Sequence, residues 1–321
     1  MTGSQSGREH IADQFFNAVR SDNVQTVRRL LTAHPELARA RWPGRAGDGR
    51  MRSLGASPYN RHTWMTVPGG HEPEDPRFTS APVIYTRNDE ILTLLVAAGA
   101  DVNAKGTSGD LETPEWFYTP LWRAAHDGRL ASVRLLVEHG ADIDYKDPDG
   151  CHQALKTAAE NGRLEVCDYL LSRGATPDLI TASMLGLVER VDAIIASGRQ
   201  AIDARDGHGR SALDAATLLD TYRACHTGLH AGHDQTAEIL IAHGAAVDLE
   251  HAASLGQMDI VHEMVQQDSE ALTRPRRIKA LIGGAAIRES PLRAAKRRNR
   301  TEVVTYLVRH GAVDDPPALY C

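Results

Sequence analysis

The chain has 321 residues and a formal net charge of −6, which excludes it from the general polyanion binders. Its four cysteines form no Cys-x-x-Cys pair, which argues against a cysteine zinc site and a disulfide framework and indicates a reducing cytoplasm. The first ten residues are polar, and no apolar run approaches the roughly 20 residues that span a bilayer. We therefore expect a soluble cytoplasmic protein with no membrane partner.

Five apolar stretches end in Gly followed by Ala. These pairs begin at Gly99, Gly140, Gly174, Gly244 and Gly311. The successive intervals are 41, 34, 70 and 67 residues, so the last two are each close to twice a period of about 33. Apolar residues at helical spacing precede the stops, as at Val133, Leu136 and Val137. Because glycine adopts the left-handed conformation that closes a helix, each pair predicts a helix C-terminus.

A shorter helix with small residues is predicted before each longer one. In residues 119–128, Thr119 caps the helix, Pro120 occupies its first turn, and Ala124 and Ala125 allow a neighbour to approach. This segment resembles the Thr-Pro-Leu-His-x-Ala-Ala signature of the ankyrin-repeat family. Weaker copies begin at Gln153, Ser211 and Ser290.

The resemblance implies an all-α solenoid of about eight helix-turn-helix repeats, with inserted loops or β-hairpin fingers, in one domain over residues 1–321. The expected helix pairs cover residues 11–34, 79–100, 119–141, 153–175, 178–198, 211–245, 249–267 and 290–312. The signature histidine is replaced in the four copies by Trp122, Lys156, Asp214 and Arg293. We therefore expect stacking that is less regular than in the consensus family.

Three insertions interrupt the repeats, at residues 40–80, 105–118 and 220–235. The first two lie at the finger position of the fold, and long loops without structure of their own are usually functional or disordered. The first insertion holds Trp64 and the second holds Trp116. Two interpretations of the first remain open: a cap over a degenerate second repeat, whose first helix is short, or a lid over a pocket.

Ankyrin proteins bind through finger tips and the inner face of the first helices, which the resemblance carries to particular positions here. These are Glu115, Trp116, Tyr118, His126, Asp127, Asp149, His152, Glu160, Asn161, His208 and Arg210. Such a mixture of carboxylates, imidazoles and aromatic rings suits a polar partner peptide, or an acid and a base beside a small molecule. The alternative for any single residue is that it is merely solvated.

We expect a non-catalytic binding protein of bacterial type that captures a partner protein or ligand on its concave face, without a cofactor. The alternative hypothesis is an enzyme or small-molecule receptor, in which Trp64 and Trp116 wall a pocket. Its candidate catalytic groups are Tyr118, His126, Asp127 and His208. A partner protein predicts an open groove, whereas the alternative predicts an enclosed cavity of about 300 Å³ or more.

Histidines gather in the third insertion, where His226, His230 and His233 precede Asp234. On a helix these residues would supply zinc ligands, because positions four apart face the same way. Gly228 and Gly232 weaken such a helix, and we predict no metal site.

The C-terminal region is basic. Residues 274–300 hold ten Lys or Arg and one acid, Glu289, which leaves a formal charge of −15 on the rest of the chain. Neither interleaved aromatic residues nor a known nucleic-acid module accompanies this charge. We therefore interpret residues 268–321 as a solvated capping region rather than a nucleic-acid site, although an anionic group of a ligand would be attracted there.

Overall fold

A computed structural model describes residues 3–40, 81–107, 117–146, 153–207, 209–217, 232–273, 276–279 and 286–313. The chain divides into two compact units. The first consists of Met1–Ala158 and Arg163–Ala175, and the second of Ala159–Gly162 and Thr176–Cys321. Among the described residues, no helix is both long enough and apolar enough to cross a membrane.

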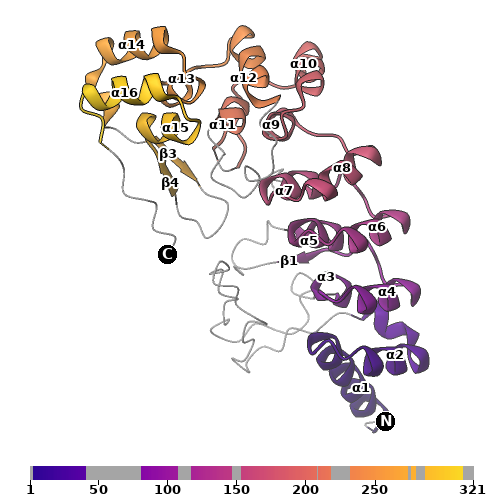
Figure 1. Ribbon diagram of the computed structural model, residues 1–321. Coiled ribbons are helices and arrows are strands. Elements are labelled where there is room, and N and C mark those ends of the chain that lie inside the picture. The colour runs from indigo at the N-terminus through magenta and orange to yellow at the C-terminus, as the bar shows by residue number, and fades with distance from the viewer. Residues whose placement is uncertain are drawn as a thin grey trace. The chain divides into compact units, whose positions relative to one another are not determined.

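The first unit is built from helices that follow one another in antiparallel pairs (Figure 1). They are α1 (Gly3–Arg20), α2 (Val24–Ala33), the 3-10 helix η1 (Pro35–Arg39), α3 (Pro82–Tyr85), α4 (Asp89–Ala97), α5 (Pro120–Asp127), α6 (Leu130–Glu138), α7 (Ala154–Glu160) and α8 (Leu164–Ser172). The last turn of α7 belongs to the second unit. Helix α1 begins at Gly3, earlier than the expected start near residue 11, and α3 is as short as predicted.

The second unit continues the same pattern. Its helices are α9 (Leu179–Met184), α10 (Val188–Ala196), α11 (Ala212–Thr217), α12 (His233–Ala242), α13 (Leu249–Leu255), α14 (Met258–Gln267), α15 (Pro291–Arg297) and α16 (Thr301–Arg309), with the 3-10 helix η6 (Ser269–Leu272) after α14. The described residues thus form eight helix pairs, which confirms the predicted all-α repeat architecture.

The predicted Gly-Ala stops are helix C-caps. All five glycines have positive φ, from 84° at Gly99 to 94° at Gly174. In each pair the alanine N–H donates to a carbonyl five residues earlier, as Ala100 does to Leu95 at 2.9 Å and Ala175 to Leu170 at 3.0 Å. This is the Schellman arrangement, which satisfies carbonyls that the helix leaves without a partner. The glycine supplies the left-handed conformation, and the alanine is the next residue of the same motif.

Small residues let the first helices of each repeat pack closely. In α5, Ala124 and Ala125 are fully buried, and the Thr119 side chain accepts from the Trp122 N–H at 3.1 Å. Val133 and Leu136 of α6 are also fully buried. In the second unit one apolar cluster joins α13 to α16. Its members are Leu249, Ala252, Ala253, Val261, Val265, Leu272, Leu292, Ala295, Val303, Leu307 and Ala312.

Arginines in the turns between paired helices tie one repeat to the preceding one. The Arg163 Nε donates to the His126 carbonyl at 3.2 Å, and Arg300 Nε donates to the Ser254 carbonyl at 3.0 Å. Each arginine passes over the glycine that caps the first helix of the preceding repeat, Gly128 after α5 or Gly256 after α13. A Cβ on Gly128 would lie 2.6 Å from the Arg163 Cδ, and one on Gly256 would lie 3.1 Å from the Arg300 Cδ. The absence of a side chain at these glycines leaves room for the tie.

Two antiparallel hairpins project between repeats. Strand β1 (Gly106–Thr107) pairs with β2 (Phe117–Tyr118) at the base of the second predicted insertion. Strand β3 (Arg276–Lys279) pairs with β4 (Ala286–Glu289), with Arg277 opposite Arg288. The first hairpin fits the predicted finger. The second lies inside the predicted capping region, where no finger was expected.

Candidate binding surface

Several predicted site residues lie outside the described part of the chain. They are Trp64, Glu115, Trp116, Asp149, His152 and His208, and of Tyr118 only the backbone is described. The pocket between Trp64 and Trp116 therefore stays a prediction.

His126 and Asp127 form the centre of a charged cluster at the end of α5. The His126 Nδ1 lies 2.9 Å from the Asp127 Oδ1. The Asp127 Oδ2 lies 3.4 Å from the Nε of Arg123, 3.6 Å from that of Arg87 and 3.9 Å from that of Arg129. We call these five residues the α5 cluster. One carboxylate thus faces three guanidinium groups and one imidazole.

The electrostatics of the α5 cluster keep Asp127 ionised. Burial by itself raises the pKa of this carboxyl. The hydrogen bond with His126 and the positive charges of Arg123, His126 and Arg87 outweigh burial and lower the pKa to about 2. Asp127 is therefore a permanent negative charge at physiological pH, and its side chain is only 16% exposed.

Arg129 fixes the turn that carries Arg87. Its Nη2 donates to the Thr86 carbonyl at 3.2 Å, and its Nη1 donates to the Asp89 Oδ1 at 3.0 Å. Asn88 caps α4 by accepting from the Ile91 N–H at 3.2 Å. Arg87 lies between these anchored residues, so its backbone position is set by contacts from the next repeat.

The α5 cluster is partly open to solvent. The side chain of Arg87 is 49% exposed, that of His126 34% and that of Arg123 20%. Strand β2 leads through Thr119 directly into α5, so the base of the finger and the α5 cluster belong to one repeat. The cluster therefore combines fixed geometry with accessible charge.

Glu160 and Arg210 do not form part of an accessible surface, which corrects their predicted role in ligand binding. The Arg210 Nη2 lies 2.6 Å from the Glu160 Oε1 and 2.5 Å from the Asp206 Oδ2. The exposed fractions of these three side chains are 1%, 7% and 5%. Burial lowers the pKa of the guanidinium, but the two carboxylates outweigh it and raise the pKa above its usual range. This buried group of one arginine and two carboxylates has a structural role. Asn161, another predicted site residue, is half-buried in the turn after α7.

A polar ladder links two first helices of the second unit. The His251 Nε2 lies 3.0 Å from the Asp214 Oδ1, and the Ser211 N–H and hydroxyl donate to the Asp214 Oδ2. His251 and Asp248 form a capping box. Asp248 thus starts a further copy of the motif, in which His251 occupies the signature histidine position. Allowing Asp as the capping residue would have found this copy from the sequence.

The third insertion is shorter at its C-terminal end than predicted. His233 begins α12, is buried, and its Nε2 lies 2.8 Å from the Met184 carbonyl oxygen. His226 and His230 lie outside the described residues. In the part of the chain that the structure describes, no group of three or more potential ligand residues is arranged to hold a metal ion.

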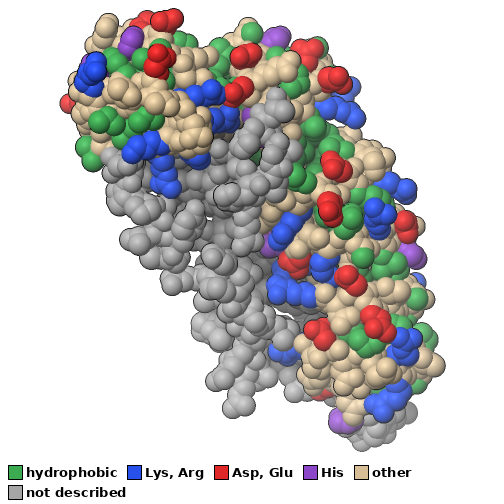
Figure 2. Space-filling model, viewed as in Figure 1, with side chains coloured by type: hydrophobic (Ala, Val, Ile, Leu, Met, Phe, Trp, Pro, Cys, Tyr) green, Lys and Arg blue, Asp and Glu red, His purple; other side chains and the backbone are tan. Residues whose placement is uncertain are grey.

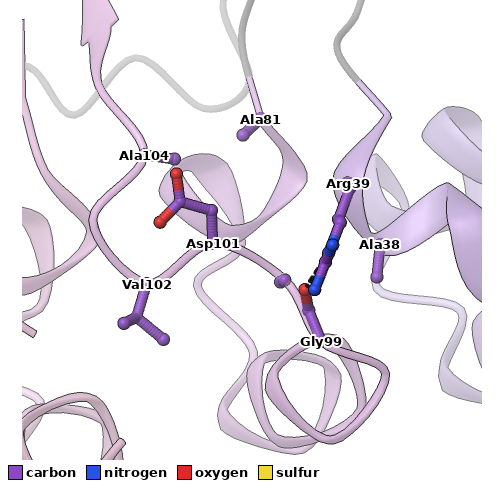
Figure 3. A pocket seen from close by; sticks show the side chains of 8 residues that line it. Ala38, Arg39, Ala81, Gly99, Asp101, Val102 and Ala104 are labelled. Atoms are coloured by element: carbon purple, nitrogen blue, oxygen red, sulfur yellow. Dashed lines mark hydrogen bonds between the residues drawn. The ribbon is translucent and has the colours of Figure 1, made fainter. Parts of the chain in front are cut away.

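A pocket of about 510 Å³ lies beside η1 in the first unit (Figure 3). It is lined by Ala38, Arg39, Ala81, Gly99, Ala100, Asp101, Val102 and Ala104. The Arg39 Nε donates to the Gly99 carbonyl at 2.7 Å, and Asp101 accepts from the Asn103 N–H at 2.9 Å. Both charged groups are thus engaged within the protein, and no aromatic residue lines the pocket among the described residues.

Two arginines of the basic C-terminal region form ion pairs within the protein. The Arg298 Nη1 and Arg300 Nη2 bind the two carboxylate oxygens of Asp234 at 2.5 Å and 2.7 Å. Arg298 also donates to the Ala216 carbonyl. Acidic and basic side chains are interspersed over the described surface seen in Figure 2. These two arginines therefore stabilise the stack of repeats in the second unit.

Residues 83–181 match a family model described as ankyrin repeats (3 copies). The chain is 32% identical to the ankyrin repeat and KH domain-containing protein mask-1 of Caenorhabditis elegans over 120 residues, which are 35% of this chain and 4% of that protein. It is 33% identical to the human ankyrin repeat and KH domain-containing protein 1 over 91 residues, 28% of this chain and 3% of that protein.

A third relative is the transient receptor potential cation channel subfamily A member 1 homolog of Caenorhabditis elegans, 34% identical over 105 residues, 30% of this chain and 8% of that protein. The chain thus spans less than a tenth of each of these three relatives, and the likeness is one of repeats rather than of whole proteins. The matched motif, the helix pairs and their Gly-Ala caps agree: residues 83–181 are ankyrin repeats, and the described helix pairs outside this range share their architecture.

Proposed function

We propose that the chain captures a partner protein through the first helices of its repeats and its hairpin fingers. Ankyrin repeats generally mediate protein–protein interaction, and solenoids of this kind present extended surfaces for that purpose. We also propose a cytoplasmic location, since Cys167 is a free buried thiol, which suits a reducing compartment.

The observation that carries the proposal is the α5 cluster. Arg87, Arg123 and His126 are partly exposed, and they are held around Asp127 by contacts from two successive repeats. Side chains that are ordered before binding lose less conformational entropy when a partner arrives. A partner that reaches the base of the β1–β2 finger would meet this cluster next along the same repeat.

Among the residues that the structure describes, the enzyme hypothesis finds no support of comparable strength. A carboxylate with a pKa of about 2 is a weak base, whereas a general base works best with a pKa near the operating pH. Asp127 is therefore suited to anchoring arginines rather than to moving protons. The only pocket that we describe has both of its charged groups engaged in internal hydrogen bonds.

The test is affinity capture from the source cells with the full chain and two variants. The first variant carries Arg87→Gln and Arg123→Gln together. The control is Arg29→Gln, which changes an exposed arginine of α2 that makes no ion pair with the described residues. Circular dichroism establishes that each variant is folded.

The proposal predicts at least one protein that the wild type and Arg29→Gln capture, and that the double variant loses. Two outcomes would contradict it: no protein is captured by the wild type, or the captured set is the same for all three chains. Quantitative mass spectrometry of the bound fraction distinguishes these outcomes.

A further inference from the structure

We propose that His126 offers the lone pair of its Nε2 to the partner, so that this point of the surface accepts a hydrogen bond from an N–H or O–H group. Asp127 and Trp122 act as positioning residues for the imidazole. Because the contact would be made by a captured protein, it rests on the proposed function.

Two contacts fix the imidazole of His126. Its Nδ1 lies 2.9 Å from the Asp127 Oδ1, and its ring packs against that of Trp122, with 5.3 Å between the ring centroids and 32° between the planes. Trp122 stands at the signature histidine position, four residues before His126, so the two side chains are neighbours on α5. Trp122 is buried, which makes it a fixed support. The ring of His126 is therefore ordered before a partner arrives.

The contact with Asp127 decides which ring nitrogen carries the proton. Burial raises the pKa of Asp127, but the hydrogen bond with His126 and the neighbouring positive charges lower it to about 2, so the carboxylate is ionised and can only accept. A neutral imidazole has one donor nitrogen and one acceptor nitrogen, and a carboxylate beside one of them selects the tautomer. Nδ1 therefore donates to Asp127, and the lone pair of the neutral ring lies on Nε2.

The second ring nitrogen is open to a partner. Within the part of the chain that the structure describes, the His126 Nε2 takes part in no hydrogen bond or ion pair. The His126 side chain is 34% exposed, and Nε2 is not one of the buried polar atoms that lack a hydrogen-bond partner, so solvent reaches it. His126 thus presents an ordered acceptor at the end of α5.

An acceptor at this point selects among the groups of a partner. A lone pair attracts an N–H or O–H group and repels the lone pairs of a carboxylate or phosphate oxygen. Because the imidazole is already held by Asp127 and Trp122, little conformational entropy is lost when the hydrogen bond forms. His126 therefore favours a backbone amide, a hydroxyl or a side-chain amide over an acidic group.

The first measurement needs no partner. The full chain is labelled with 15N in its histidines, and two-bond 1H–15N correlations show which nitrogen of each ring carries the proton. The spectra are recorded at about pH 8, above the usual titration range of histidine. The spectrum of His126→Asn, which lacks one set of signals, assigns His126. We expect a protonated Nδ1 and an unprotonated Nε2, and a proton on Nε2 overturns the inference.

The second measurement uses a protein captured by the wild type, purified after its identification by mass spectrometry, and compares affinities by calorimetry. His126→Gln keeps a side-chain amide near the Nε2 position. His126→Asn keeps one near the Nδ1 position, and with it the contact to Asp127. The matched control is His139→Asn, which changes an exposed histidine at the end of α6 whose Nδ1 lies 2.8 Å from the Leu135 carbonyl oxygen. Circular dichroism establishes that each variant is folded.

We expect His126→Asn to weaken binding about tenfold, and His126→Gln and His139→Asn to stay within about threefold of the wild type. A role of His126 limited to holding Asp127 predicts the reverse order. A loss in His126→Gln that equals or exceeds that in His126→Asn therefore overturns the inference while leaving partner binding intact. If the wild type captures no protein, the proposed function itself fails, and the inference fails with it.

Discussion

Replacing Arg210 by Ala should destabilise the second unit severely. Arg210 is 1% exposed and lies 2.5 to 2.6 Å from the carboxylates of Asp206 and Glu160, so the variant removes a cation that both buried carboxylates bind. Removing one partner of a buried ion pair typically costs about 3 to 5 kcal/mol. By contrast, Arg28→Ala breaks a pair with Glu90 in which both side chains are about half exposed, and such pairs contribute about 0 to 1 kcal/mol.

Urea denaturation followed by circular dichroism measures both losses, and hydrogen exchange shows in which unit each loss occurs. The reasoning is refuted if Arg210→Ala loses no more free energy of unfolding than Arg28→Ala.

Two further predictions concern the repeat scaffold. Gly128→Ala should cost about 0.5 to 1.5 kcal/mol more than Gly140→Ala in urea denaturation. Both glycines have positive φ, but only a Cβ at residue 128 displaces the Arg163 side chain from its hydrogen bond to the His126 carbonyl; equal losses would contradict this role of Arg163. The pKa of His251 is raised, since burial lowers it but the hydrogen bonds and charges of Asp214 and Asp248 outweigh burial. The stabilisation from His251 is therefore fully present below about pH 6.5 and is lost as the pH rises through the folded-state pKa. Urea midpoints from pH 5.5 to 8.5 should fall with pH in the wild type and much less in a His251→Gln chain, and parallel curves would count against this assignment.

The repeat scaffold was predictable because its signals are local. A glycine with positive φ followed by a small residue marks each stop, and a capping residue followed by Pro120 marks the start of α5. Both signals lie within one turn of helix, so the helix ends can be recognised even where the signature histidine is missing. The β3–β4 finger was missed because its basic residues were interpreted as a solvated surface.

The candidate surface was only partly predictable. The resemblance placed His126 and Asp127 on the inner face of α5, but nothing local indicates that Arg87, some 40 residues earlier, contacts Asp127. The same limit applies to Glu160 and Arg210, which meet across 50 positions and become buried. Contacts between repeats depend on stacking, and a sequence pattern within one repeat does not show which charges will pair.

The most direct test of the account is hydrogen–deuterium exchange of the full chain with and without a saturating amount of a protein captured by the wild type. Binding through the α5 cluster predicts slower exchange in the turn at residues 86–89 and in α5, and an unchanged rate in α6 and α16. Protection confined to α6 and α8, or to residues 274–300, would contradict the assignment of the binding surface.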